Sequence, residues 1–91
     1  MNSGMDYENL IGEIVRKQMD ILGPDMAVRT ANQVTGLEID DQGVVSKLDG
    51  DPEQILQKLV EQYISLSGEI VRNILNPVFQ KYPEIKLNLN K

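Results

Sequence analysis

Residues 49–76 read DGDPEQILQKLVEQYISLSGEIVRNILN and combine a sharp helix start with a long apolar pattern. Asp51 can accept hydrogen bonds from the first free amides, and Pro52 has the backbone angle that the first helical position needs. Apolar residues then recur at helical spacing to the end of the quoted stretch. The pattern predicts a helix over 52–76 that ends or kinks before Pro77, because the residue before a proline disfavours helical angles.

This predicted helix is long for the chain that carries it. A helix over 52–76 would measure about 37 Å, whereas a compact chain of this size has a diameter of about 30 Å. The helix either breaks at Ser65–Gly68, where two serines and a glycine weaken helical preference, or runs through and packs against a second copy. We expect the second arrangement, a homodimer, because two-fold pairing is the commonest way to cover such a surface. The expected interface residues are Leu59, Leu66, Ile70 and Ile74.

The N-terminal part of the sequence predicts two helices. Apolar residues spaced by three and four indicate a helix over 5–22, after a frayed start at residues 1–4. Gly23 supplies a permissive backbone for a stop, and Pro24 suits the start of a second helix that should run to Val34. The short connection favours an αα-hairpin.

Residues 37–48 alternate apolar and polar side chains on both sides of Asp40–Gly43, which predicts a β-hairpin. The stretch 85–91 also alternates, and it is either a third strand, which we favour, or a tail that orders only against a partner. The predicted fold class is therefore α+β and mainly helical, with an αα-hairpin, a β-hairpin and a long C-terminal helix. Residues 1–91 are expected to form a single domain.

The composition restricts the possible functions. The chain has no His and no Cys, so neither the commonest general base nor a thiolate nucleophile is present. Its net charge is −5, and its basic residues are scattered, so nucleic acid and anionic membranes are poor partners. No apolar run approaches the roughly 20 residues that cross a bilayer. We expect a cytoplasmic protein, since the absence of Cys fits a reducing compartment.

No motif indicates a catalytic, cofactor or metal site. Asp49 and Asp51 flank Gly50, but the series of oxygen ligands that a calcium loop needs does not follow. A turn followed by a helix cap explains these residues without a metal. No glycine-rich phosphate loop is present, and no pair of carboxylates is selected by spacing. We therefore expect a protein that is not an enzyme.

Two functional hypotheses remain. The first is a non-enzymatic protein-interaction or regulatory module that self-associates through helix 52–76. The second is a regulatory domain that binds a small molecule between the helices and the hairpin, where Arg29 and Asn32 could line a pocket. The alternative interpretation of Arg29 and Asn32 is the solvated face of a surface helix, which we favour.

Overall fold

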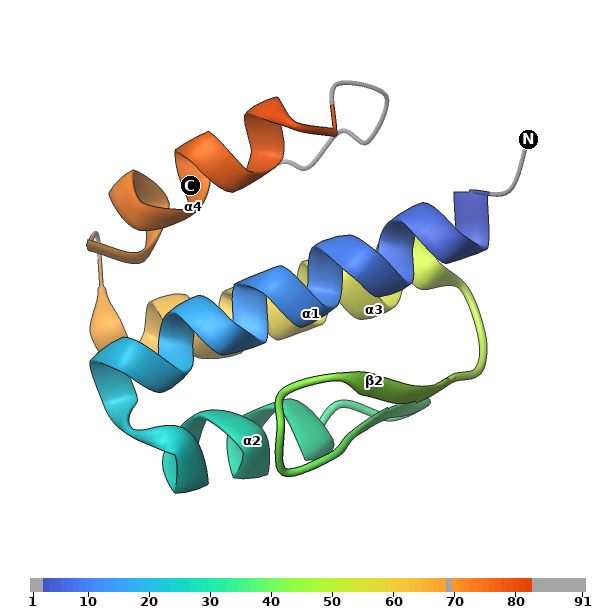
Figure 1. Cartoon of the computed structure of the whole chain (residues 1–91), viewed down its shortest axis with the longest axis horizontal. Coiled ribbons are helices and arrows are strands. Elements are labelled where there is room, and N and C mark those ends of the chain that lie inside the picture. The colour runs from blue at the N-terminus through green and yellow to red at the C-terminus, as the bar shows by residue number, and fades with distance from the viewer. Residues whose placement is uncertain (1–2, 69, 83–91) are drawn as a thin grey trace.

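The computed structural model describes residues 3–68 and 70–82, with side chains described from Asp6 onward. Its fold is α+β and mainly helical, as the sequence predicts (Figure 1). The elements, in chain order, are α1 (Ser3–Leu22), α2 (Pro24–Asn32), β1 (Leu37–Ile39), β2 (Val45–Leu48), α3 (Pro52–Ser67) and α4 (Ile70–Gln80).

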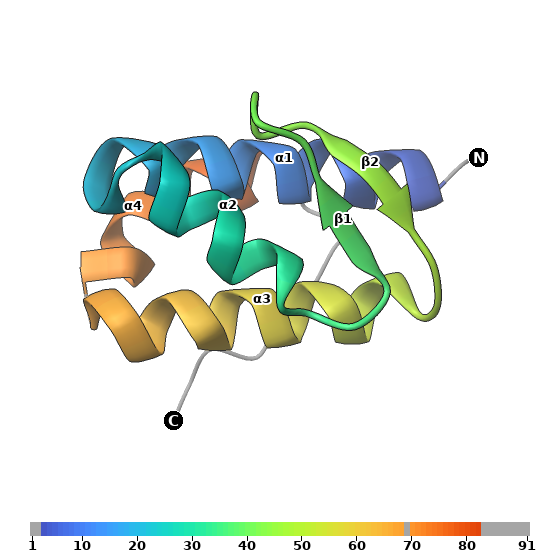
Figure 2. The ribbon, with the colours of Figure 1, turned by 90° about the horizontal axis from the view of Figure 1, so that it is seen from below.

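Helix α1 is the element on which the others assemble. It contacts α2, α3, α4 and strand β2. In Figure 1, α4 lies above α1, α3 lies behind it, and α2 and the hairpin lie below it. The turned view in Figure 2 shows α2 running between α1 and α3 while the hairpin crosses toward the other end of α1. The apolar face of α1 is buried, with Leu10, Ile11, Ile14 and Val15 fully inaccessible to solvent.

The turn between α1 and α2 follows the glycine–proline pattern of the sequence. Gly23 has φ 91° and ψ 149°, a backbone conformation that is essentially restricted to glycine, and Pro24 begins α2. The αα-hairpin forms as predicted, although α2 ends at Asn32 rather than Val34. Ala27 and Ala31 are fully buried, and their small side chains let α2 lie close to its neighbours.

The β-hairpin is antiparallel, with Leu37 opposite Leu48 and an irregularity between Glu38 and Ile39. Its turn is stabilised by the Asp40 carboxylate, which accepts hydrogen bonds from the amides of Gln42 and Val44 at 2.8 and 3.0 Å. On the opposite side, the turn rests on α1, where the Arg16 guanidinium donates to the Gly43 carbonyl at 3.1 Å. The predicted third strand at 85–91 lies outside the described residues.

Helix α3 begins at Pro52, as predicted, and the Asp51 carboxylate accepts a hydrogen bond from the Glu53 amide at 3.1 Å. Further along, the buried Tyr63 hydroxyl donates to the Ala27 carbonyl at 2.7 Å and joins α3 to α2. Burial raises the pKa of this hydroxyl, so it stays protonated and keeps donating throughout the physiological range.

The expected continuous helix over 52–76 is wrong. Helix α3 ends at Ser67, and Gly68 turns the chain with φ 74° and ψ −150°, so the break at Ser65–Gly68 is the correct alternative. Of the two alternatives predicted at Pro77, an end and a kink, the end is wrong, because α4 continues through Pro77 to Gln80. Val78, which follows the proline, is buried in the core, and this burial offsets the helical hydrogen bond that proline cannot make.

Because of this turn, α4 returns over α1 and closes the core. Its inward residues Val71, Leu75 and Val78 are at most 1% exposed and belong to the same apolar cluster as the buried faces of α1, α2 and α3. Gln18 of α1 is also fully buried, and its amide has no hydrogen-bond partner among the described residues.

We predict that Leu59→Ala lowers the free energy of unfolding by about 2–5 kcal/mol, because it leaves a cavity at a fully buried position. In contrast, Leu66→Ala on the exposed face of the same helix should change it by less than about 0.5 kcal/mol. Urea unfolding followed by circular dichroism measures both values. Equal effects of the two substitutions would contradict the placement of Leu59 in the core.

Candidate functional site

Four large apolar side chains in the terminal turns of the helices are exposed to solvent. Figures 1 and 2 show the α1–α2 turn and the α3–α4 junction at the same end of the molecule. Each of these helices places one such side chain in its terminal turn at this end. Their exposed fractions range from 37% to 51%, high for side chains of this size. We call this set the apolar end, and it consists of Ile21, Met26, Leu66 and Ile70.

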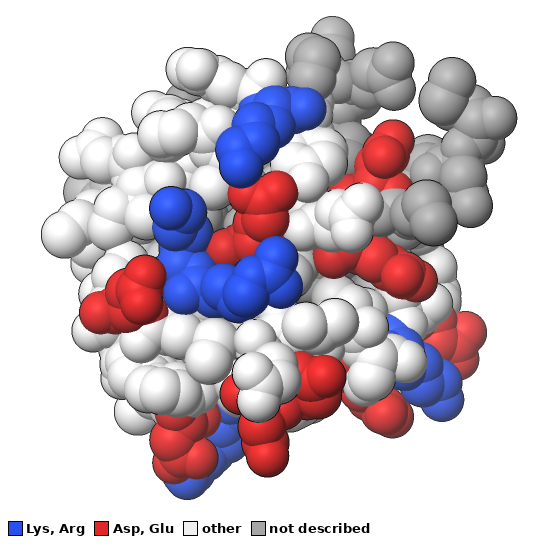
Figure 3. Space-filling model, viewed as in Figure 1, with Lys and Arg blue, Asp and Glu red and all other residues white. Residues whose placement is uncertain are grey.

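Charged side chains are unevenly spread over the face shown in Figure 3. The upper left of this view holds few described Lys, Arg, Asp or Glu side chains, whereas the centre, the left edge and the lower part hold many. The sequence nevertheless places Arg72 in the first turn of α4, and the chain as a whole carries a net charge of −5. An area with few charges on an acidic protein is a place where a second macromolecule can approach with less electrostatic repulsion.

The four interface residues expected from the sequence lie in different environments in the structure. Leu66 and Ile70 lie on the apolar end, on either side of Gly68. Leu59 is fully buried in the chain's own core and Ile74 is half-buried, so the interface has to be corrected by removing Leu59. The sequence pattern did not separate the buried face of α3 from the exposed residues at the α3–α4 junction. It treated residues before and after the turn as parts of one straight helix.

The sequence pattern does not identify Ile21 and Met26 as candidate interface residues. Ile21 lies outside the buried stripe of α1, and Met26 lies outside the alanine face of α2. An apolar residue that falls off the buried stripe of an amphipathic helix is the signal that could have identified both. The placement of the α1–α2 turn and the α3–α4 junction at the same end of the molecule depends on the tertiary fold, which the helical pattern alone does not give (Figure 1).

A polar cluster fastens the far end of α4 to the middle of α1. The Glu13 carboxylate accepts hydrogen bonds from the Lys81 ammonium at 2.7 Å and from the Tyr82 hydroxyl at 2.8 Å. The hydrogen bond from Lys81 is the main cause that lowers the pKa of Glu13. Burial and the bond to Glu13 together raise the pKa of Tyr82 to about 12. We call this cluster the Glu13 clamp.

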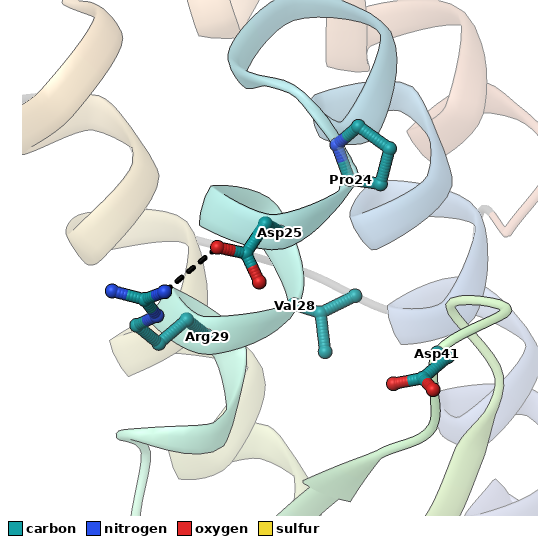
Figure 4. Close-up of a pocket in the computed structure, with 5 residues that line it drawn as sticks. All are labelled: Pro24, Asp25, Val28, Arg29 and Asp41. Atoms are coloured by element: carbon teal, nitrogen blue, oxygen red, sulfur yellow. Dashed lines mark hydrogen bonds and ion pairs between the residues drawn. The ribbon is translucent and has the colours of Figure 1, made fainter.

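A hollow of about 420 Å³ lies between α2 and the turn of the hairpin (Figure 4). Its lining residues are Pro24, Asp25, Val28, Arg29 and Asp41. Figure 4 shows Arg29 bonded to Asp25 on the same helix, and the two groups are 2.7 Å apart in an exposed ion pair. The hollow therefore presents two carboxylates and a guanidinium to solvent.

Arg29 lines this hollow, whereas Asn32 lines a different one, of about 450 Å³, beside the connection from α2 to β1. The Asn32 side chain also accepts a hydrogen bond from the Ile39 amide at 2.7 Å and donates to the Ile39 carbonyl at 3.2 Å. Both ends of its amide are thus bonded to the edge of β1 that is not paired with β2 in the described part of the chain. Asn32 anchors the hairpin to α2, a role that a sequence pattern does not reveal.

Other kinds of site find little support in the geometry. Within 3–68 and 70–82, His, Cys, Asp and Glu residues do not form a group of three or more that could hold a metal ion. In the same residues, no helix combines the length and apolarity needed to cross a membrane. Asp51, considered above as a calcium ligand, is the cap of α3.

Comparisons of the chain with protein-family models, with curated proteins and with solved structures give no significant match. The functional argument therefore depends on the apolar end, the Glu13 clamp and the hollow beside α2.

The Glu13 clamp predicts a dependence of stability on pH. Because the pKa of Glu13 is lowered in the folded state, the clamp stabilises the fold above the unfolded pKa of roughly 4.3. This contribution is lost as the pH falls through the lower, folded-state pKa. Urea unfolding at pH 3–7 should therefore show a higher free energy of unfolding for the native chain than for Glu13→Gln at pH 7. This difference in the free energy of unfolding should shrink below about pH 4.

The control for this measurement is Glu38→Gln, at an exposed position of β1. This variant removes one carboxylate outside the clamp and so accounts for the change in net charge alone. A gap between native and Glu13→Gln chains that is independent of pH would contradict the clamp.

Proposed function

We propose that the chain is a non-enzymatic interaction module that self-associates through the apolar end. The observation that supports this proposal is the half exposure of two large apolar side chains, Leu66 and Ile70, on either side of the turn at Gly68. Covering such side chains removes apolar area from water, which is favourable by about 25 cal/mol per Å².

A second copy of the chain suits this surface for an electrostatic reason. Two molecules with a net charge of −5 repel each other over most of their surfaces. The repulsion is smallest where charged side chains are few, which favours contact through areas such as the upper left of Figure 3. Two-fold pairing then brings the same patch of each copy together, which is the commonest arrangement for small homo-oligomers.

The rest of the sequence favours binding over catalysis. Without His and Cys, the chain lacks the side chains that most often act as general bases and nucleophiles near neutral pH. Several surface acids have a structural role: Asp51 caps α3, Asp40 stabilises the hairpin turn and Asp25 pairs with Arg29. We propose the cytoplasm as the setting, supported by the absence of Cys.

Ile70→Lys tests the self-association. It places a charge at the centre of the proposed contact, and since Ile70 is half exposed, the fold should tolerate it. In sedimentation velocity, the apparent mass of the native chain should rise toward twice 10.2 kDa as the concentration increases. The apparent mass of the variant should stay near 10.2 kDa. The expected loss of association is at least tenfold, about 1.4 kcal/mol, because a buried unpaired charge is costly.

Val44→Lys is the matched control, because Val44 is a similarly exposed apolar side chain but lies in the hairpin turn and not at the α3–α4 junction. This variant should associate like the native chain. A native chain of 10.2 kDa at every concentration, or equal behaviour of the two lysine variants, would overturn the proposal.

A second candidate function is a regulatory domain that binds a small molecule in the hollow beside α2 (Figure 4). The guanidinium of Arg29 suits a carboxylate, and the carboxylate of Asp41 suits an ammonium group, so the ligand class is a small zwitterion. The exposure of the Arg29–Asp25 pair leaves both groups accessible from solvent.

A thermal-shift screen with free amino acids and related zwitterions tests this candidate, since a ligand that binds only the folded state raises the melting temperature. A shift that disappears in Arg29→Ala and persists in Lys17→Ala, at an exposed position of α1, would support the hollow. Shifts that survive Arg29→Ala, or the absence of any shift at millimolar ligand, would remove this candidate.

A further inference from the structure

We infer that the two associating copies exchange helix α4. In the exchanged dimer, α3 and α4 of each chain straighten through Gly68 into one helix, and α4 packs against α1 of the partner copy. The inference rests on the proposed self-association and specifies its form. It follows from three features of the structure: the turn at Gly68, the contacts of α4, and the location of the apolar end.

The first feature is the turn. With φ 74° and ψ −150°, Gly68 occupies a backbone region that is essentially restricted to glycine. The turn is closed by a hydrogen bond from the Gly68 amide to the Ile64 carbonyl at 2.7 Å, a helical i to i−4 bond that a straight helix would keep. The apolar spacing of 52–76 is also compatible with one uninterrupted helix. Residue 68 can therefore change from the turn to helical backbone angles without a steric conflict from its own side chain.

The second feature is that the contacts of α4 can be transferred. Helix α4 packs on α1 through Val71, Leu75 and Val78 and is fastened by the Glu13 clamp. An α4 from a second copy would meet the same α1 surface and make the same contacts. Exchange of an identical element keeps the number and type of these contacts. Its free-energy cost is therefore limited to the translational and rotational freedom that one chain loses when the dimer forms.

The third feature is the location of the turn. A straight helix over 52–80 would be about 43 Å long, which exceeds the longest dimension of the molecule, 33 Å. Its α4 part must therefore leave the molecule, and it leaves at the apolar end, where the α3–α4 junction lies (Figure 1). Two copies would then face each other at this end. Leu66 and Ile70, which are half exposed in the single chain, would be covered by their counterparts.

Gly68→Ala tests the inference through the hinge. In the folded-back chain, alanine would be strained at this positive φ, whereas in a straight helix alanine is the most favourable residue. Each exchanged dimer relieves this strain in two chains. We therefore expect the dimer association constant to rise by roughly tenfold or more, measured by sedimentation velocity.

Gly23→Ala is a matched control. Gly23 has a similar backbone conformation, with φ 91° and ψ 149°, and at both glycines an added Cβ atom would meet nothing within 4 Å in the described part of the chain. The following Pro24 prevents a straight helix through the α1–α2 turn. This variant should therefore lose stability without gaining dimer.

Cross-linking distinguishes exchange from simple contact. Because the native chain has no Cys, Glu13→Cys and Lys81→Cys introduce single reactive sites at the two ends of the clamp. The two variants are unfolded together, refolded as a mixture and treated with a short bismaleimide. Exchange places residue 13 of one chain beside residue 81 of the other, so a denaturing gel should show a product of twice 10.2 kDa. Each variant alone, treated in the same way, gives the background.

The outcomes separate the two proposals. A dimer that forms without the mixed cross-link, and whose association constant is unchanged by Gly68→Ala, would overturn the exchange but leave self-association in place. A chain that is monomeric in both native and Gly68→Ala forms would overturn both.

Discussion

The glycine-restricted turn at Gly68 is the constraint on which the architecture depends. Without it, the apolar pattern of 52–76 would continue as a straight helix longer than the rest of the molecule. With it, α4 returns to α1 and buries Val71, Leu75 and Val78, which completes the core. The same turn leaves Leu66 and Ile70 on its outer side, exposed to solvent. Core closure and the candidate interaction surface are thus two consequences of one backbone conformation.

Helix α1 provides the surface on which the other parts assemble, but these parts are attached in different ways. Helix α2 is joined through Gly23 and Pro24, and the proline forbids a helix that continues from α1. The hairpin is bonded to both α1 and α2 through Arg16 and Asn32. Helix α4, in contrast, is joined through a turn that can become helical. This difference explains why α4 is the element suited to a change of partner.

Local signals in the sequence were sufficient to predict much of the fold. The cap at Asp51, the glycine–proline pair at 23–24 and the alternation around Asp40–Gly43 each act over a few residues, and each gives the structure it predicts. The choice at Ser65–Gly68 could not be made in this way. A turn there is favourable only because α4 finds the surface of α1, a contact between segments roughly 60 residues apart.

The candidate site was harder to predict from the sequence for the same reason. Leu66 and Ile70 were selected, but Leu59 was grouped with them because a straight helix places all three on one broad stripe. Glu13 is bonded to Lys81 and Tyr82, which lie far away in the sequence. Asn32 and Arg29 look equivalent as polar residues of one helix, yet one is bonded to strand β1 and the other faces solvent. Side-chain partners of this kind are set by tertiary packing.

Native-state amide hydrogen exchange tests most directly whether α4 is a unit that can leave α1 while the remainder of the chain stays folded. The account predicts that the amides of Val71, Leu75 and Val78 share one opening reaction, with a smaller free energy than the amides of Ile14 and Leu59. If the α4 amides instead exchange only through global unfolding, with the same free energy as those of α1 and α3, the central claim is contradicted.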